Sequence, residues 1–446
     1  MDAMTSLTFI YLALPFAMAV YLLCPPRWRP QALLALSVAY CFLAYPPLVL
    51  YMIGIVLTDL AALAVMGRYD DNSSVRKLCL AFSLTKNLGC ILLFGGILHV
   101  GLPVPEMIFG LYVVTLSAMG CVLEVYRRQA PNAGGPVGFA LYCLYFPRLA
   151  AGPLTSYREL APYLEAPDTS LSEIAKGLGL FIQGAVKLTV LGQTLYVFYD
   201  TLRVIPQGDA SVLGVWITVF VLILSIYYRF SGCVDMARGI GRMMGISLPE
   251  SFRYPFRRTS VTDFFRRFNS SLTRYLRDAL GPHFTSSADF AASALGLLII
   301  SAGAGLWFGF SAGRLAWGIY LGLFLIMERY LYPGLLEKAP PALRRVYALL
   351  VVFLSFTLFD AQSLSAGAQT AGRMLGFGDL PFYSDRLGYL LQSNRLLLIA
   401  GALFAMGVHV RLFSFLRRHT PAPLYGALMV VINLFLLALL TAFSIA

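Results

Sequence analysis

The residues of this chain that could do chemistry are concentrated first in the segment Phe230–Gly245. It contains one acid, two arginines and four glycines, and it directly follows an apolar run. Asp235 and Arg238 are spaced i, i+3, so they can pair on one face of a helix. An ionisable residue at membrane depth is a functional candidate, although an ion pair that only holds helices together gives the same pattern. Asp235, Arg238 and Arg242 are therefore candidate substrate- or donor-binding residues, with helix packing as the alternative.

A second polar segment follows, and its periodicity predicts an amphipathic helix from Ser260 to Leu280. Apolar residues recur at three- and four-residue spacing on one face, and arginines occupy the other. Seven arginines fall between positions 253 and 277, which predicts the cytoplasmic side of a membrane. The amide of Asn269 borders the apolar face. We expect it to face the protein interior, bonded to a neighbouring helix or lining a polar cavity.

Histidine, the side chain best suited to proton transfer near neutral pH, is scarce in this chain. The four histidines are His99, His283, His409 and His419. Only His283 lies near the arginine-rich segment in sequence, and the preceding Pro282 suits a loop equally well. No C-x-x-C pair occurs among the seven cysteines, which favours small buried hydrophobes over a metal site.

The elements that position these residues are membrane spans. Apolar residues make up 59% of the 446 residues, charged residues 13%, and the mean hydropathy is +0.74, which no water-soluble domain of this size shows. We expect about eleven spans, and Leu78–Leu98, interrupted by Lys86 and Asn87, is a further span or a partly buried segment. The apolar runs are Leu7–Cys24, Ala32–Tyr45, Leu48–Met66, Met107–Leu123, Gly177–Tyr199, Val212–Tyr228, Phe290–Phe310, Leu315–Met327, Ala342–Leu358, Leu396–Phe415 and Leu424–Ile445.

The organisation of the chain is that of a single membrane domain covering residues 1–446, because no internal repeat or long linker divides it. The first apolar run lacks a basic leader and a cleavage site, so we expect a retained span. The net charge of +12 is typical of topology signals facing an anionic leaflet, and we expect the lipid bilayer and no nucleic acid as a partner.

The chemistry-bearing segments together resemble one known family. The first reads F-S-G-x-x-D-M-A-x-G-I-G-R-M-x-G-I, and it is followed by L-P-E-S-F-R-Y-P-F and S-V-T-D-F-F-R-R-F-N-x-S-L-T-x-Y-L-R-D. Phe146–Leu154 is similar to F-P-x-L-x-A-G-P, and Gly177–Lys187 and Phe356–Phe377 match further motifs. This pattern resembles the membrane-bound O-acyltransferase (MBOAT) family, in its bacterial branch that acetylates alginate and related exopolysaccharides. The resemblance is strongest over a core at about residues 140–330.

The resemblance implies an all-α polytopic fold, with interfacial and re-entrant helices around a central tunnel. It implies O-acylation, most simply acetylation, of a cell-envelope or secreted polysaccharide in the bacterial cytoplasmic (inner) membrane. The donor would be acyl-CoA or a carrier-bound acyl group, and no cofactor or metal would be bound. Implied partners are periplasmic or extracellular acyltransferase and polysaccharide-synthesis proteins. Further candidate binding residues on matching positions are Tyr254, Arg267, Arg277, Asp278 and Trp307.

The chain departs from the family where the family carries histidine. Asn269 stands at the histidine of W-R-R-W-H-x-S-L, and Phe308 stands at the histidine of G-L-W-H-G. Leu321 replaces a third. Asn has no useful pKa and Phe neither donates nor accepts a hydrogen bond, so a general-base contribution of about 10²- to 10⁴-fold is at stake. The catalytic residues are therefore unknown.

Three functions remain open at this point. The first is an O-acyltransferase, of which transfer of D-alanine to teichoic acid is a variant. The second is a catalytically inactive MBOAT-like protein that binds a ligand or acts as a scaffold in an exopolysaccharide complex. The third is a transporter with Lys86, Lys187 and Asp235 as a relay, which predicts inverted repeats that the sequence lacks.

Overall fold

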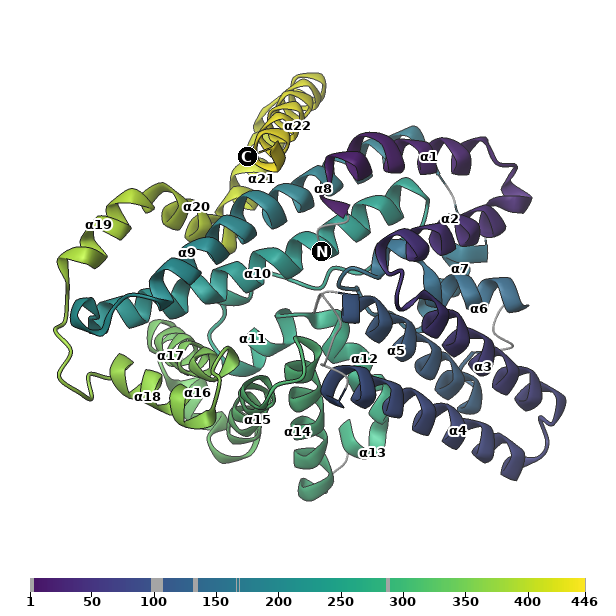
Figure 1. Ribbon diagram of the computed structural model, residues 1–446, viewed down its shortest axis with the longest axis horizontal. Coiled ribbons are helices and arrows are strands. Elements are labelled where there is room, and N and C mark those ends of the chain that lie inside the picture. The colour runs from purple at the N-terminus through teal and green to yellow at the C-terminus, as the bar shows by residue number, and fades with distance from the viewer. Residues whose placement is uncertain are drawn as a thin grey trace. The chain divides into compact units, whose positions relative to one another are not determined.

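The protein is described by a computed structural model, and the structure describes residues 4–97, 107–130, 135–165, 167, 169–285 and 289–445. Within these ranges the regular elements are helices, and strand pairing is limited to one isolated antiparallel bridge between Phe252 and Phe268 (Figure 1). The predicted all-α class is therefore confirmed.

The chain groups into two compact units. The first comprises Met1–Ala185, Cys233–Glu250 and Ser444–Ala446, and the second comprises Val186–Gly232 and Ser251–Phe443. The first unit contains α1 (Leu14–Leu23), α2 (Arg29–Ala44), α3 (Val49–Arg68), α4 (Ser73–Leu92), α5 (Met107–Tyr126), α6 (Gly135–Leu144), α7 (Tyr157–Glu165), α8 (Leu171–Val186) and the end of α10 (Val212–Met243). The second contains α9 (Thr194–Arg203), most of α10, α11 (Val261–Arg267), α12 (Ser270–Leu280), α13 (Pro282–Thr285), α14 (Phe290–Trp307), α15 (Ala312–Ile326), α16 (Pro333–Lys338), α17 (Pro341–Phe359), α18 (Leu364–Met374), α19 (Asp385–Ser393), α20 (Arg395–Ala405), α21 (Val408–His419) and nearly all of α22 (Ala422–Ile445).

The membrane spans can be counted by length and composition. Among the described residues eight helices are long and apolar enough to cross a bilayer, or nine if α19 and α20, bent by 67°, form one broken span. The remaining predicted runs fold as shorter helices: α2 has 16 residues and α15 has 15. The run Leu396–Phe415 is divided between two helices: α20 ends at Ala405 and α21 begins at Val408. Gly407, just before α21, has a φ of 67°, which interrupts the helical path. The chain is thus a multi-pass membrane protein.

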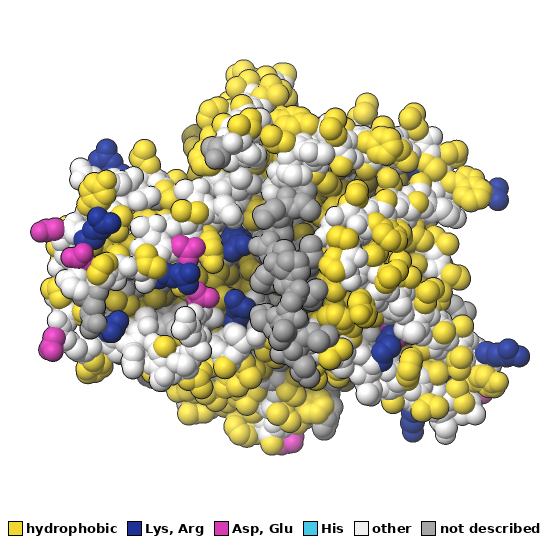
Figure 2. Space-filling model, viewed as in Figure 1, with side chains coloured by type: hydrophobic (Ala, Val, Ile, Leu, Met, Phe, Trp, Pro, Cys, Tyr) yellow, Lys and Arg dark blue, Asp and Glu magenta, His cyan; other side chains and the backbone are white. Residues whose placement is uncertain are grey.

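A surface of apolar side chains agrees with this conclusion. Figure 2 shows hydrophobic side chains over much of the visible face. In α22 only 6% of the most apolar stretch is buried inside the protein, so lipid is the expected neighbour of that helix.

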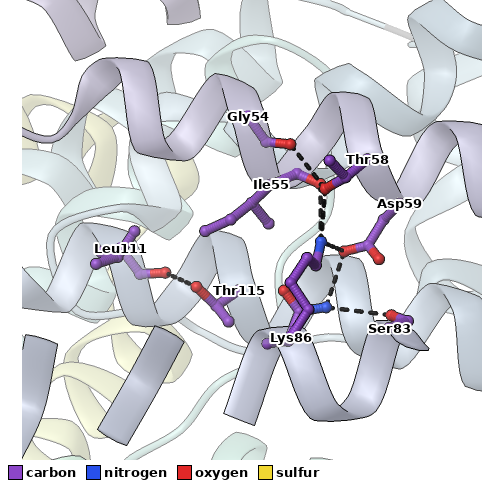
Figure 3. Close-up of polar contacts among 9 residues, drawn as sticks. Gly54, Ile55, Thr58, Asp59, Ser83, Lys86, Leu111 and Thr115 are labelled. Carbon is purple, nitrogen blue, oxygen red and sulfur yellow. Dashed lines mark hydrogen bonds and ion pairs between the residues drawn. The ribbon is translucent and has the colours of Figure 1, made fainter. Parts of the chain in front are cut away.

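In the first unit, α3, α4 and α5 pack against one another, and a charged cluster joins two of them. Lys86 of α4 lies 2.9 Å from the carboxylate of Asp59 on α3 and donates to Thr58 Oγ1 at 2.7 Å (Figure 3). Asn87 donates to the same carboxylate at 2.8 Å and to Ser83 Oγ at 3.1 Å. The charge that interrupts Leu78–Leu98 is therefore paired, which explains how α4 can be a candidate span.

Gly239, one of the glycines of the segment Phe230–Gly245, has a packing role in the same unit. A Cβ at Gly239 would lie 2.6 Å from the amide nitrogen of Phe181, and one at Gly177 would lie 2.6 Å from the Gly239 carbonyl oxygen. Only glycine permits so close an approach of the backbones of α8 and α10.

The second unit contains a helical hairpin of α14 and α15, against which α11, α12 and α17 also pack. The hairpin is tight because a Cβ at Gly318 would lie 2.3 Å from the carbonyl oxygen of Ser301. Its connection begins with Phe308, directly after α14.

Candidate functional site

The predicted helix from Ser260 to Leu280 is broken at Phe268 and Asn269, so the expectation of one continuous helix is wrong. α11 ends at Arg267 and α12 begins at Ser270, and Asn269 between them has φ 62° and ψ 56°. The reason is nonlocal, because the segment around Phe252 pairs with the break. The Ser270 amide donates to the Ser251 carbonyl at 2.7 Å instead of continuing the helix.

Asn269 suits this break chemically. Asn adopts the left-handed conformation more readily than most residues, so the turn is little strained. Its side chain is buried, and its Oδ1 accepts a hydrogen bond from Ser271 Oγ at 3.3 Å. Ser271 Oγ lies 2.7 Å from Ser251 Oγ. The amide therefore faces the interior with a polar partner, whereas its cytoplasmic placement stays a prediction.

Phe308 lies in an aromatic cluster formed by Phe230, Phe268, Phe308, Trp317, Phe356 and Phe359. Its ring centroid is 4.7 Å from that of Phe230 and 5.5 Å from that of Phe359. The ring of Phe268, the neighbour of Asn269, is 5.9 Å away. The segments around Asn269 and Phe308, which the resemblance aligns with the histidines of the family, thus meet in space, but Phe308 has no proton acceptor.

Tyr254 lies at a second left-handed position, with φ 51°, and it approaches a histidine that the sequence gave no reason to select. Its hydroxyl is 3.4 Å from Nε2 of His409. Gly407 allows the contact, because a Cβ there would lie 2.6 Å from the tyrosine ring. His409 is 155 positions from Tyr254, so no local spacing could have revealed the pair. His99 lies outside the described residues, as does the side chain of His283.

The residues predicted from Phe230–Gly245 are found in the first unit. Asp235 and Arg238 form the expected i, i+3 ion pair, with 2.9 Å between Oδ1 and Nη1. Arg242 pairs with Glu173, and both arginines line a cavity of about 290 Å³ together with Ser247. Their pairing favours helix packing as much as ligand binding, and their role stays a prediction.

In the second unit, four arginines surround a cavity of about 670 Å³, here called the arginine pocket. They are Arg266, Arg277, Arg329 and Arg344. Among the residues that the structure describes, none of the four forms an ion pair with a carboxylate. Burial and then the charge of Arg266 lower the pKa of Arg277, although an arginine stays protonated at neutral pH. Of the predicted candidates only Arg277 lines this pocket.

The acids on the wall of the arginine pocket are Asp263 and Glu328. Both carboxylate oxygens of Glu328 accept hydrogen bonds at the start of α11, from the amides of Val261 and Thr262, each at 2.8 Å. Glu328 therefore serves as a helix cap, and the arginines keep an excess of positive charge for an anion.

A further cavity of about 240 Å³, here called the Asp360 pocket, also lies in the second unit. The Tyr199 hydroxyl donates to Asp360 Oδ2 at 2.8 Å. Phe356 contributes to both the wall of this pocket and the aromatic cluster. No local spacing in the sequence reveals this pair, because its members are 161 positions apart. Across the described part of the chain, no group of three or more His, Cys, Asp or Glu residues could hold a metal ion.

The remaining predicted residues are dispersed. Trp307 is buried at the end of α14, and Asp278 follows Arg277 on α12. Arg267 ends α11, where its carbonyl oxygen accepts from the Arg253 amide at 3.2 Å. These three do not line any of the cavities above.

Comparisons with known proteins give a matching family and several relatives. The model of the membrane-bound O-acyltransferase family matches residues 125–368, which is more than half of the chain. The probable alginate O-acetylase AlgI of Azotobacter vinelandii is 28% identical over 403 residues, covering 84% of this chain and 78% of that protein. The peptidoglycan O-acetyltransferase of Helicobacter pylori is 27% identical over 306 residues, covering 63% and 58%. The teichoic acid D-alanyltransferase of Bacillus subtilis is 22% identical over 223 residues, covering 47% and 56%.

Proposed function

We propose a function on one premise: the chain belongs to the membrane-bound O-acyltransferase family. Its proposed reaction is transfer of an acyl group, most simply acetyl, from a thioester to a hydroxyl of a cell-envelope or secreted polysaccharide. The similarity to proteins named for acyl transfer to alginate, peptidoglycan and teichoic acid supports this class of acceptor. The proposed location is the bacterial cytoplasmic membrane.

The observation that carries the proposal is the arginine pocket within the family-matched core. Four guanidinium groups without a carboxylate partner among the described residues favour an anionic ligand. The lining also includes apolar side chains, among them Phe265, Phe284 and Leu325. An acyl-CoA combines phosphates with a less polar pantetheine arm, so its chemistry fits such a pocket. Acyl-CoA is therefore the proposed donor, ahead of a carrier-bound acyl group.

A second candidate function is favoured by the aromatic cluster. At the two positions where the family carries histidine, Asn269 is hydrogen-bonded to a serine and Phe308 is packed among rings. Neither can act as a general base. This geometry supports a protein that has kept ligand binding and lost histidine-based catalysis, serving as a scaffold for polysaccharide-synthesis and periplasmic acyltransferase partners.

Turnover by purified protein separates the two candidates. The protein would be reconstituted with acetyl-CoA and the unacetylated polysaccharide fraction extracted from a strain that lacks this protein. Thiol release together with ester formation on the polysaccharide would support the acyltransferase. Binding of acetyl-CoA without either product would support the non-catalytic candidate.

The remaining binding candidates have separate proposed roles. Asp235, Arg238 and Arg242 are proposed to shape the donor path, and so are Tyr254 and Trp307. Arg267 and Asp278 are proposed to stabilise α11 and α12 around the donor. Alanine variants of each, compared for acetyl-CoA affinity and thermal stability, would separate binding from packing.

A further inference from the structure

The Asp360 pocket places a carboxylate one residue along the chain from a member of the aromatic cluster that contains Phe308. Asp360 directly follows Phe359, whose ring centroid lies 5.5 Å from that of Phe308. Phe356, one turn earlier on α17, lines the pocket and packs 5.5 Å from Trp317 of the same cluster. The cavity therefore borders the aromatic cluster, and Asp360 lies where α17 ends.

The carboxylate is held in a defined orientation. Tyr199 donates to Oδ2 at 2.8 Å, and the positive charge of Arg314 also acts on Asp360. Among the described residues the structure gives Oδ1 no hydrogen-bond donor. One oxygen is thus fixed by the protein, and the other can accept a proton from a ligand.

The rest of the pocket wall suits a polyhydroxylated ligand. Hydroxyl groups and charged groups of both signs line the cavity, and they belong to Arg203, Asp209, Thr218, Thr357, Thr370 and Arg373. The three threonine hydroxyls among them donate to carbonyl oxygens of their own helices and can accept from sugar hydroxyls, whereas the arginines can donate to them. Figure 2 shows acidic and basic side chains close together on the left of the view, over the part of the second unit where α17 to α19 lie.

We propose that Asp360 is the general base of this protein, acting on an acceptor sugar hydroxyl bound in the Asp360 pocket. The inference rests on the proposed acyltransferase function and names the residue that replaces the family's histidine. Asp360 takes the hydroxyl proton as the sugar oxygen bonds to the carbonyl carbon of the acyl thioester. The carbon–sulfur bond then breaks, and the leaving thiolate takes the proton back from Asp360. The products are an O-acyl sugar and a free thiol, and the carboxylate is regenerated.

The variant Asp360→Asn tests the proposal in the reconstituted assay with acetyl-CoA and the unacetylated polysaccharide fraction. The amide keeps the shape and cannot accept the proton, so kcat should fall by about 10²- to 10⁴-fold, the range of a general base. The conservative Asp360→Glu should retain a measurable part of kcat. Asp379→Asn, an exposed aspartate outside the pocket, is the matched control and should keep the wild-type rate.

Tyr199 is proposed as a positioning residue, and its variant provides an independent test. Tyr199→Phe should lower kcat several-fold and leave KM for acetyl-CoA unchanged, because only the orientation of the carboxylate is lost. A general loss of structure would instead change both values and the thermal unfolding temperature.

The outcomes distinguish the role of Asp360 as general base from the acyltransferase function on which it rests. A wild-type rate in Asp360→Asn overturns the inference and leaves the acyltransferase function standing. Wild-type protein without turnover overturns both. If Asp360→Asn fails to fold, Asp360→Glu and Tyr199→Phe decide: kcat unchanged in both contradicts the proposal, and a reduced kcat with unchanged KM in both supports it.

Discussion

Two charged clusters in this protein differ in how their charges are balanced. In the first unit, Lys86 is paired with Asp59, and Asn87 donates a hydrogen bond to the same carboxylate. The cation and the anion of this cluster are therefore both supplied by the protein. In the arginine pocket of the second unit, four cations surround a cavity without a carboxylate partner among the described residues. A balanced cluster inside a span has the properties of an interaction that stabilises the packing of two helices. An unbalanced cluster around a cavity has the properties of a binding site, because a ligand must supply the missing charge.

The largest expected effect comes from breaking the balanced cluster. Asp59→Ala leaves Lys86 without its partner between α3 and α4. We expect a loss of about 3 kcal/mol in the free energy of unfolding, at the low end of the range for a broken buried pair. The low end applies because the Lys86 side chain is 22% exposed and can reach a more polar environment. Thermal unfolding in detergent micelles measures the effect.

The control for this prediction is the double variant Asp59→Ala with Lys86→Met. Removing both charges should restore much of the lost stability. A double variant as unstable as Asp59→Ala alone would show that the ion pair is not the stabilising feature, and the structural role of the Lys86–Asp59 cluster would be wrong.

The arginine pocket should respond in the opposite way. Arg277→Ala removes one of several like charges, so stability should be unchanged or slightly higher. Affinity for acetyl-CoA should fall by about 1.5–3 kcal/mol, the contribution of a charged hydrogen bond, which is roughly ten- to a hundredfold in Kd. Isothermal titration at two salt concentrations measures the affinity and its screening.

Arg274→Ala on the same helix is the matched control, because Arg274 does not line the pocket. Its Kd for acetyl-CoA should equal that of wild type. Equal losses in both variants would mean that net charge, and not the pocket, governs donor binding.

The sequence predicted most of what depends on local periodicity. Helical class, multi-pass character and the Asp235–Arg238 pair follow from apolar runs and from i, i+3 spacing, and the structure contains all three. The burial of Asn269 also followed from the apolar stripe. Features that depend on distant segments were not predictable. The break at Asn269 requires pairing with Phe252, and Tyr199 meets Asp360 only through the tertiary fold.

An unpartnered polar group should also be costly at an uncharged position, and Phe308 provides the test. Phe308→His places a polar ring among aromatic neighbours that offer it little hydrogen bonding. We expect a loss of about 1–3 kcal/mol in unfolding free energy, the cost of an unsatisfied buried polar group. Thermal unfolding measures it, with Phe308→Leu as the apolar control. A stable Phe308→His variant with raised acetyl transfer would contradict this expectation and indicate a polar path to this position.

The smallest effect is expected at Asn269, where backbone conformation and side-chain bonding can be separated. Asn269→Ala must hold a Cβ in the left-handed region and loses the bond to Ser271, which should cost about 1–2 kcal/mol in unfolding free energy. Asn269→Gly loses the same bond without the conformational strain, so its loss should be smaller. Asn269→His should be tolerated almost as well as Asn, because histidine is enriched in this conformation and can bond a serine hydroxyl. Thermal unfolding of the three variants gives the order. If the Ala and Gly variants are equally destabilised, the hydrogen bond and not the left-handed turn explains why Asn occupies this position. If the order is Ala, Gly, His from least to most stable, the turn selects the residue, and histidine could occupy the same backbone position without rebuilding the break between α11 and α12.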